Sequence, residues 1–275
     1  MFSPYYAWAR RRAARGGPGS EPEDHCAINV ALYGIAGKRW TMTERTRRHT
    51  QRGAHHFVVG PSSLHWDGQA LTLELDEIGA PIPFRVRGRV RVQPAGLSRF
   101  VTALDDAGRH RWGPIAPVAR VEAEFDAPRT RWKGHAYFDS NEGDEPINRP
   151  FIEWDWARAE LRDGRTAVVY DVRQKERSDR LLALRFARDG TVDAFAPPPR
   201  QALARTGWRL SPSMRSETPV RRLQVLEDTP FYARAVLDAR LAGEQVVAMH
   251  ETLDLRRLTL PIVQAMLPWR MPRRR

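Results

Sequence analysis

The stretch RVRGRVRV, Arg85–Val92, alternates basic and apolar residues along its length. Successive side chains of a β-strand point to opposite faces, so the valines lie on one face and the arginines on the other. This pattern is typical of an antiparallel strand with one buried face and one solvated face. The segment 71–76, LTLELD, repeats the pattern with leucines on one side. The sequence therefore predicts a β protein.

Further strand-like segments follow, separated by turn signals such as Asp67-Gly68, Asp163-Gly164 and Asp189-Gly190. Strands are predicted at 118–125, 132–139, 167–173, 181–187, 220–226, 232–239 and 244–255. Many short strands joined by tight turns must hide their edges, so we expect an all-β fold of barrels or sandwiches with few short helices.

Helices are predicted only at 154–161 and 262–267, where good helix formers cluster. The first of these segments begins with Trp154-Asp155-Trp156, in which two indoles flank an acid. In a helix these two indoles diverge by roughly 200°, so we expect that they do not line one site.

A run of turn-forming residues, SNEGDEPINRP at 140–150, separates two strand-rich halves. We therefore predict two domains, 1–148 and 149–275. A chain of 275 residues, of which 41% are hydrophobic, is long enough to bury a core in each.

Basic residues exceed acidic ones by 45 to 33, which gives a formal net charge of +12. Such an excess is compatible with a solvated surface, an anionic membrane surface or nucleic acid. Because no recognition motif accompanies the charge, we expect no nucleic-acid partner. The single Cys26 precludes an internal disulfide, and the sequence shows neither a secretory signal nor an apolar run of about 18 residues. These features predict a reducing, cytoplasmic setting.

Motifs for nucleotide, metal and acyl-transfer chemistry are missing from the sequence. It contains no GxGxxG, no GxxxxGK[ST] and no GxSxG. His55, His56 and His65 lack the cysteine or carboxylate spacing of a metal site. We therefore predict no nucleotide cofactor and no metal.

Two pairs of residues with i, i+2 spacing carry the chemistry: His110 with Trp112, and Tyr137 with Asp139. On strands, both members of each pair point the same way. An imidazole, an indole, a phenol and a carboxyl group that line an apolar cavity would suit proton transfer to an apolar substrate and stabilisation of a cation. Such a role requires burial to raise the pKa of Asp139.

Each of these residues also has a purely structural interpretation. Asp139 can end a strand as a turn residue, and His110 can be a hydrogen-bonded histidine beside a hairpin. Trp112 and Tyr137 can be ordinary core aromatics. Spacing alone leaves these alternatives open.

Several blocks, taken together, resemble the acyclic carotenoid 1,2-hydratases (hydroxyneurosporene synthases) of purple phototrophic bacteria. The resemblance runs nearly end to end. It rests on FSPYYAWAR at 2–10, DHCAINVALY at 24–33, the two pairs above, FIEWDW at 151–156 and LPWRMP at 267–272.

This resemblance implies two tandem lipocalin-like domains and a cofactor-independent hydro-lyase of carotenoid biosynthesis. Such an enzyme adds water to the terminal C1,C2 double bond of lycopene- or neurosporene-type carotenoids. The family's essential positions fall on His110, Trp112, Tyr137 and Asp139 in the N-terminal domain, with Asp139 as proton donor. Either His110 or the Asp139 carboxylate is the base. Longer family members carry a strand-like segment upstream of residue 2, which implies an N-terminal domain without its first strand here.

Because the substrate lives in membranes, we expect a basic peripheral protein on the cytoplasmic side of the inner or intracytoplasmic membrane. Contact with anionic lipid and association with other carotenoid-pathway enzymes are the expected partnerships. The rival interpretation is a lipocalin-like protein that binds isoprenoids or carotenoids without chemistry.

Overall fold

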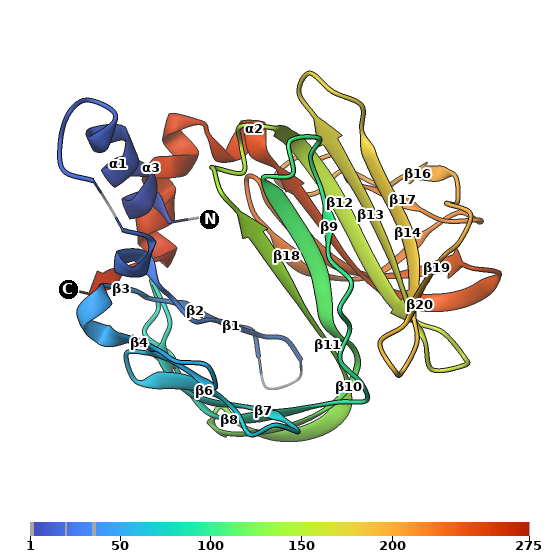
Figure 1. Ribbon diagram of the computed structural model, residues 1–275, viewed down its shortest axis with the longest axis horizontal. Coiled ribbons are helices and arrows are strands. Elements are labelled where there is room, and N and C mark those ends of the chain that lie inside the picture. Colours follow the sequence, from blue (N-terminus) through green and yellow to red (C-terminus); the bar gives the residue numbers. More distant parts are fainter. Residues whose placement is uncertain (1–2, 20, 35–36, 275) are drawn as a thin grey trace. The chain divides into compact units, whose positions relative to one another are not determined.

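The computed structural model describes residues 3–19, 21–34 and 37–274, and β-strands make up most of them (Figure 1). The chain divides into two compact units, each built from separate segments. The first comprises Met1–Gln93, Arg120–His135 and Gln264–Arg275, and the second Pro94–Ala119 and Ala136–Val263. No break between these segments falls at residue 148, and the division into domains 1–148 and 149–275 stays a prediction.

The first unit contains short antiparallel strands joined mostly by tight turns. They are β1 (Asn29–Leu32), β2 (Arg39–Met42), β3 (Glu44–Arg45), β4 (Thr50–Arg52), β5 (His56–Val59), β6 (Ser62–Trp66), β7 (Leu71–Ile78) and β8 (Arg85–Pro94). Strands β4 to β8 pair in chain order, and β1 pairs with β2. This arrangement is the meander that the alternating sequence pattern predicts.

The alternation in β8 is confirmed. Val86 is fully buried, whereas Arg85 and Arg89 are exposed and pair across the strands with carboxylates of β7. Arg85 contacts Asp76 at 2.7 Å, and Arg89 contacts Glu74 at 2.5 Å. One face of the sheet is therefore apolar and the other carries ion pairs in solvent.

Gly88 interrupts the valines of β8 for a steric reason. A Cβ atom at this position would lie 2.4 Å from the carbonyl oxygen of Glu124 and 2.7 Å from Cα of Phe125. The neighbouring strand therefore leaves no room for a side chain there. The apolar core of this unit consists of Ile28, Val30, Val59, Leu75, Val86, Ala123 and Phe125.

Two long strands, β10 (His110–Ala127) and β11 (Arg129–Gly143), pair with each other, and β10 also pairs with β8. They confirm the strands predicted at 118–125 and 132–139 and extend beyond both ends of each. Residues 110–119 and 136–143 belong to the second unit, and these parts carry the two predicted pairs of functional residues.

The second unit is built on a seven-stranded antiparallel sheet with the order β15-β14-β13-β12-β20-β19-β18. Its strands are β12 (Phe151–Glu160), β13 (Thr166–Gln174), β14 (Arg180–Phe186), β15 (Val192–Ala194), β18 (Arg221–Asp228), β19 (Tyr232–Leu241) and β20 (Glu244–Asp254). Shorter strands are β9 (Thr102–Ala103), which pairs with β10, and β16 (Arg200–Ala202), which pairs with β17 (Ser213–Arg215). The strands predicted in this region are confirmed. The sheet is open at both ends, so among the described strands the fold is sandwich-like and not a closed barrel.

The helix predicted at 154–161 is wrong, because this segment forms strand β12. It pairs along most of its length with β13 and β20, for example Trp156 with Tyr170 and with Glu251. Alanine, arginine and glutamate favour a helix locally, but two strand partners satisfy the backbone groups on both edges. The alternation of residues in WDWARA fits the period of 2 of a strand, although the composition fits a helix. Pairing with the two neighbouring strands decided in favour of the strand.

The two faces of β12 serve different purposes. Ala157 and Ala159 pack into a core with residues of β13, β19 and β20. Trp154, Trp156 and Arg158 point to the opposite face, since residues two apart on a strand share a side. The correction to a strand therefore places both tryptophans on one surface.

Helices are few. They are α1 (Pro4–Ala13), α2 (Leu255–Leu258) and α3 (Pro261–Arg270), with 3-10 turns η1 (Pro22–His25) and η2 (Arg47–His49). The helix predicted at 262–267 is confirmed within α3. Helix α1 was missed, although Ser3 accepts a bond from the Tyr6 N–H as its N-cap and Pro4 follows. A short strand, β21 (Arg273–Arg274), pairs in parallel with β3. Among residues 3–19, 21–34 and 37–274, no helix is long and apolar enough to cross a membrane.

Candidate active site

Strand β10 holds His110 and Trp112 on one side, and both are almost completely buried, at 4% and 1% exposure. Strand β11 holds Tyr137 and Asp139, which are partly exposed. Because β10 and β11 are hydrogen-bonded neighbours, the two pairs lie on adjoining strands of the second unit. Spacing alone had left open whether the two strands adjoin, and the structure places them side by side.

Three of the four residues form one hydrogen-bonded group around Asp139. Trp112 Nε1 donates to Asp139 Oδ2 at 2.8 Å, and the Tyr137 hydroxyl donates to the same oxygen at 3.1 Å. The other oxygen, Oδ1, accepts no hydrogen bond from the residues that the structure describes. The carboxyl group thus has one fixed oxygen and one oxygen free of protein donors.

Burial raises the pKa of Asp139, because a half-buried carboxylate loses hydration. The hydrogen bonds from Trp112 and Tyr137 oppose this effect, since they favour the charged form. Among more distant charges, Glu251 raises the pKa and Arg158 lowers it. The site therefore favours the protonated acid without removing its ability to ionise.

Burial also raises the pKa of Tyr137 well above its usual range, and the neighbouring Asp139 adds to this effect. The phenol consequently stays protonated and acts as a donor to Asp139. Tyr170 on β13 is 2% exposed, and its pKa is raised in the same direction for the same reason.

His110 lies beside this group but shares no hydrogen bond with Asp139. Its backbone N–H donates to Asp105 Oδ1 at 2.7 Å, and its ring meets the Phe151 ring edge-on at 5.0 Å between centroids. Burial lowers the pKa of His110, which favours the neutral imidazole. Its Nε2 is buried and has no hydrogen-bond partner among the described residues. This ring nitrogen is therefore a buried polar atom whose hydrogen-bonding capacity no described residue satisfies.

Sequence reasoning missed the residues of β12 and β13 that surround this group. The Trp156 ring lies 5.5 Å from that of Tyr137, and the Tyr170 ring lies 5.5 Å from that of Trp112. Trp154 meets Tyr170 edge-on at 6.0 Å. The alternation in Trp154-Asp155-Trp156 could have indicated a strand with both tryptophans on one face. Asp139 therefore sits among aromatic rings supplied by two sheets of one unit.

Arg158 is a buried cation that lies next to Tyr137. The guanidinium carbon of Arg158 lies 5.6 Å from the centre of the Tyr137 ring, and burial lowers the pKa of Arg158. Glu251, opposite Trp156 on β20, pairs with Arg234 at 2.7 Å. Arg158 forms no ion pair with a carboxylate among the described residues, and its charge interacts with those of Glu160, Asp139 and Glu251.

The arrangement can deliver a proton within an aromatic environment. No group of three or more histidine, cysteine or carboxylate side chains in the described part of the chain is placed to hold a metal ion. The residues at hand are an acid with a raised pKa, two fixed donors, a neutral imidazole and several electron-rich rings. This combination fits acid catalysis on an apolar substrate.

Comparison with solved structures supports the sandwich-like β fold. A crystal structure of a protein described as AttH from Nitrosomonas europaea matches with a TM-score of 0.57 at 13% identity, covering 82% of this chain and 80% of the other. At such low identity the likeness concerns the fold alone.

Comparison with known sequences defines the family. The model of the family "Carotenoid hydratase CrtC" matches residues 1–275. The acyclic carotenoid 1,2-hydratase of Rubrivivax gelatinosus is 61% identical over all of this chain, and that of Thiocapsa roseopersicina is 52% identical over 99% of it. This chain spans 67% of the length of each of these two relatives. The enzyme of the same name from Cereibacter sphaeroides is 38% identical, with 95% of its length covered.

The chain therefore belongs to the carotenoid hydratase family, which confirms the resemblance noted in the sequence. One quoted block of that resemblance begins at Phe2, which lies outside the described residues.

Proposed function

We propose that this chain is a hydratase that adds water to the terminal C1,C2 double bond of an acyclic carotenoid of the lycopene or neurosporene type. The observation that carries the proposal is the Asp139 carboxyl group, held by Trp112 and Tyr137 among aromatic rings with its pKa raised. The names of the relatives support the choice of substrate.

In the first proposed step, Asp139 transfers its proton from Oδ1 to C2 of the alkene. The π electron pair forms the new C2–H bond, and a tertiary cation remains at C1. Burial favours the neutral acid before transfer, whereas the two hydrogen bonds to Oδ2 stabilise the carboxylate after it. Burial thus favours the protonated acid that starts the step, and the hydrogen bonds favour the carboxylate that the step produces.

In the second step, water attacks C1 and loses a proton. The aromatic rings of Trp112, Tyr137 and Trp156 lie near the carboxyl group and would stabilise the cation by about 0.5 to 2 kcal/mol each where a ring face is presented. The Asp139 carboxylate or the neutral His110 accepts the proton from the attacking water. His110 is suited to this role because its buried Nε2 is unpartnered among the described residues.

We also propose that the reaction proceeds without a cofactor. Hydration of an alkene changes no net oxidation state, so it requires only an acid, a base and water. The side chains around Asp139 include each of these protein groups. An apolar cavity that holds the end of the polyene is part of the proposal.

Peripheral contact with anionic lipid on the cytoplasmic side of the inner or intracytoplasmic membrane is likewise proposed, as is association with other enzymes of carotenoid biosynthesis in phototrophs. The argument is chemical, because a long polyene partitions into lipid and a basic protein is attracted to anionic headgroups.

The test is incubation of the purified chain with lycopene in liposomes, without added cofactor, in water enriched in ¹⁸O. We expect a product heavier by one labelled water, with the label at a tertiary hydroxyl group. Asp139→Asn should reduce the rate by about 10²- to 10⁴-fold, because the amide cannot donate a proton of comparable acidity.

Two outcomes would contradict the proposal. Turnover retained in Asp139→Asn would remove the acid role. Lycopene bound by the wild-type chain with no gain in mass would instead support the carrier interpretation.

A further inference from the structure

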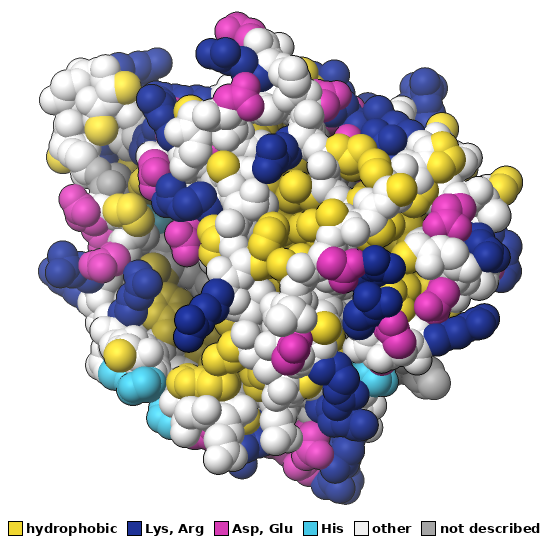
Figure 2. Space-filling view, turned by 45° about the vertical axis from the view of Figure 1, so that its right-hand side comes forward, with side chains coloured by type: hydrophobic (Ala, Val, Ile, Leu, Met, Phe, Trp, Pro, Cys, Tyr) yellow, Lys and Arg dark blue, Asp and Glu magenta, His cyan; other side chains and the backbone are white. Residues whose placement is uncertain are grey.

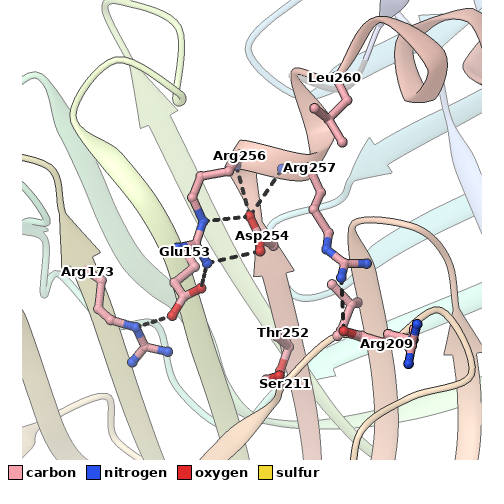
Figure 3. A pocket seen from close by; sticks show the side chains of 10 residues that line it. Glu153, Arg173, Arg209, Ser211, Thr252, Asp254, Arg256, Arg257 and Leu260 are labelled. Atoms are coloured by element: carbon pink, nitrogen blue, oxygen red, sulfur yellow. Dashed lines mark hydrogen bonds and ion pairs between the residues drawn. The ribbon is translucent and has the colours of Figure 1, made fainter.

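A second site lies on the second unit and is lined by residues other than those of the Asp139 group. It is a cavity of about 470 Å³ lined by the ends of β12, β13 and β20, by α2 and by the loop that contains Arg209 (Figure 3). Its charged lining residues are Glu153, Arg173, Arg209, Asp254, Arg256 and Arg257. The lining thus contains four guanidinium groups and two carboxylates.

The two carboxylates are already engaged by two of the arginines. Glu153 accepts from Arg173 and from Arg256, each at 2.5 Å, and Asp254 accepts from Arg256 at 3.1 Å. Figure 3 shows these contacts between the residues that line the site. Arg173 and Arg256 are therefore largely neutralised.

The backbone N–H of Arg257 donates to Asp254 at 3.2 Å, whereas its guanidinium group has no carboxylate partner among the described residues. Its guanidinium donates to the carbonyl oxygens of Trp208 at 2.6 Å, Arg209 at 3.0 Å and Pro230 at 3.3 Å. Carbonyl dipoles satisfy its hydrogen-bonding groups but leave its net charge in place. This arginine also fixes the loop that carries Trp208 and Arg209 against α2.

Arg209 is exposed, and its side chain makes no hydrogen bond or ion pair with the described residues. Its φ angle is +61°, a left-handed conformation that non-glycine residues rarely adopt. The loop is held in this shape by Leu210, which is 2% exposed, and by Thr206, which bonds to the backbone of both Arg209 and Leu210. The Arg209 guanidinium is therefore a cation without a carboxylate partner among the described residues, and Arg209 lines the site.

Apolar side chains accompany this positive charge. Trp208 is 49% exposed, Leu260 is 47% exposed and Ile262 is 70% exposed. Leu260 lines the cavity itself, and Trp208 is the residue whose carbonyl binds Arg257. Tryptophan with flanking arginine and aliphatic residues is typical of surfaces at the water–lipid boundary.

The charge on one face of the molecule is mixed. On the face shown in Figure 2, basic side chains lie next to acidic ones, with apolar groups between them. Nucleic acid requires a continuous basic track with several phosphate contacts. The site instead offers two guanidinium groups without a carboxylate partner among the described residues. The exposed Leu260 lines it, and the exposed Trp208 and Ile262 are close to its lining residues in the sequence.

We propose that this cavity binds the phosphate group of an anionic phospholipid, and that Trp208, Leu260 and Ile262 enter the lipid interface next to it. Arg209 and Arg257 supply the charge, since guanidinium groups match the geometry of phosphate oxygens. This inference rests on the peripheral lipid contact proposed above and assigns a site to it, but it does not depend on the hydration reaction.

The test is co-sedimentation of the full chain with vesicles of phosphatidylcholine alone and of phosphatidylcholine with phosphatidylglycerol. Wild type should bind the anionic vesicles. Arg209→Gln should weaken that binding by about fivefold, the effect of one arginine close to an anionic surface. Trp208→Ala should weaken it by a similar factor.

Matched controls separate the site from general charge and hydrophobicity. Arg177→Gln removes an exposed arginine elsewhere on the same unit, and Trp132→Ala removes another exposed tryptophan. Both should leave vesicle binding within about twofold of wild type. Far-UV circular dichroism and the melting temperature of each variant establish that it is folded.

Three results would overturn the proposal. The first is an equal loss of vesicle binding in Arg209→Gln and Arg177→Gln. The second is binding of inorganic phosphate that Arg209→Gln abolishes while vesicle binding persists, which would assign a soluble anion. The third is loss of DNA binding in Arg209→Gln with vesicle binding unchanged.

Discussion

The indole Nε1 of Trp112 donates a hydrogen bond to Oδ2 of Asp139 at 2.8 Å, although the two residues stand 27 positions apart in the sequence. The bond joins two neighbouring strands, and it fixes the carboxyl group whose pKa burial raises. The hydrogen bond lowers the pKa of Asp139, whereas burial raises it, so the bond limits the rise in pKa.

Trp112→Phe should reduce the rate of hydration by about ten- to a hundredfold, since a hydrogen bond to a charged group contributes about 1.5 to 3 kcal/mol. Loss of the donor raises the pKa of Asp139. If the protonated acid is the active form, the alkaline limb of the pH–rate profile moves to higher pH. A lower rate with an unmoved limb would show that Trp112 acts only through packing.

Arg158→Met should also raise the pKa of Asp139, because the guanidinium favours the carboxylate. We expect the alkaline limb to move upwards and the rate to fall by up to about tenfold. Arg185→Met is the matched control, since Arg185 lies 6.0 Å from the ring of Phe195 and is not among the charges that shift Asp139. An identical profile for both variants would remove Arg158 from the site.

Asp139→Asn should make the protein more stable than wild type at neutral pH. The folded-state pKa of Asp139 is raised, so the folded chain binds more protons than the unfolded chain between the ordinary carboxyl pKa of about 3.9 and the raised value. Wild type therefore loses stability as pH rises through that window, and the variant does not. Melting temperatures from pH 4 to pH 7 measure the difference.

Asp76→Asn provides a control of opposite sign. Its hydrogen bond from Arg85 lowers the pKa of Asp76, so the wild-type carboxylate contributes stability above the unfolded-state pKa, and this contribution is lost as pH falls. The variant should be less stable than wild type at pH 7. If both variants changed stability in the same direction with pH, the assigned shift of Asp139 would be wrong.

Glu77→Gln should destabilise the first unit by about 3 to 5 kcal/mol, the usual effect of breaking a buried ion pair. Glu77 is fully buried and accepts from Arg45 at 2.8 Å and from Ser62 at 2.7 Å. Glu74→Gln on the same strand breaks an exposed pair and should change stability by less than about 1 kcal/mol. Urea unfolding of the two variants checks the contrast, and equal losses would contradict it.

Local pattern was sufficient for most strands. The alternation in Arg85–Val92 predicted one buried and one solvated face because the side-chain period of a strand is fixed by its backbone. The pattern failed at Trp154–Glu160, where helix formers and strand alternation coexist. There the outcome depended on two pairing partners, β13 and β20, that lie far away in the sequence.

The sequence by itself determined that the chain is all-β and that His110, Trp112, Tyr137 and Asp139 form two same-face pairs, because both facts follow from period 2 alone. Only the tertiary structure decided how these residues interact. Asp139 bonds to Trp112 and Tyr137 and not to His110, and Tyr137 in turn contacts Trp156 and Arg158 of another sheet. Its raised pKa has the same origin, since burial depends on chain segments that only folding brings together.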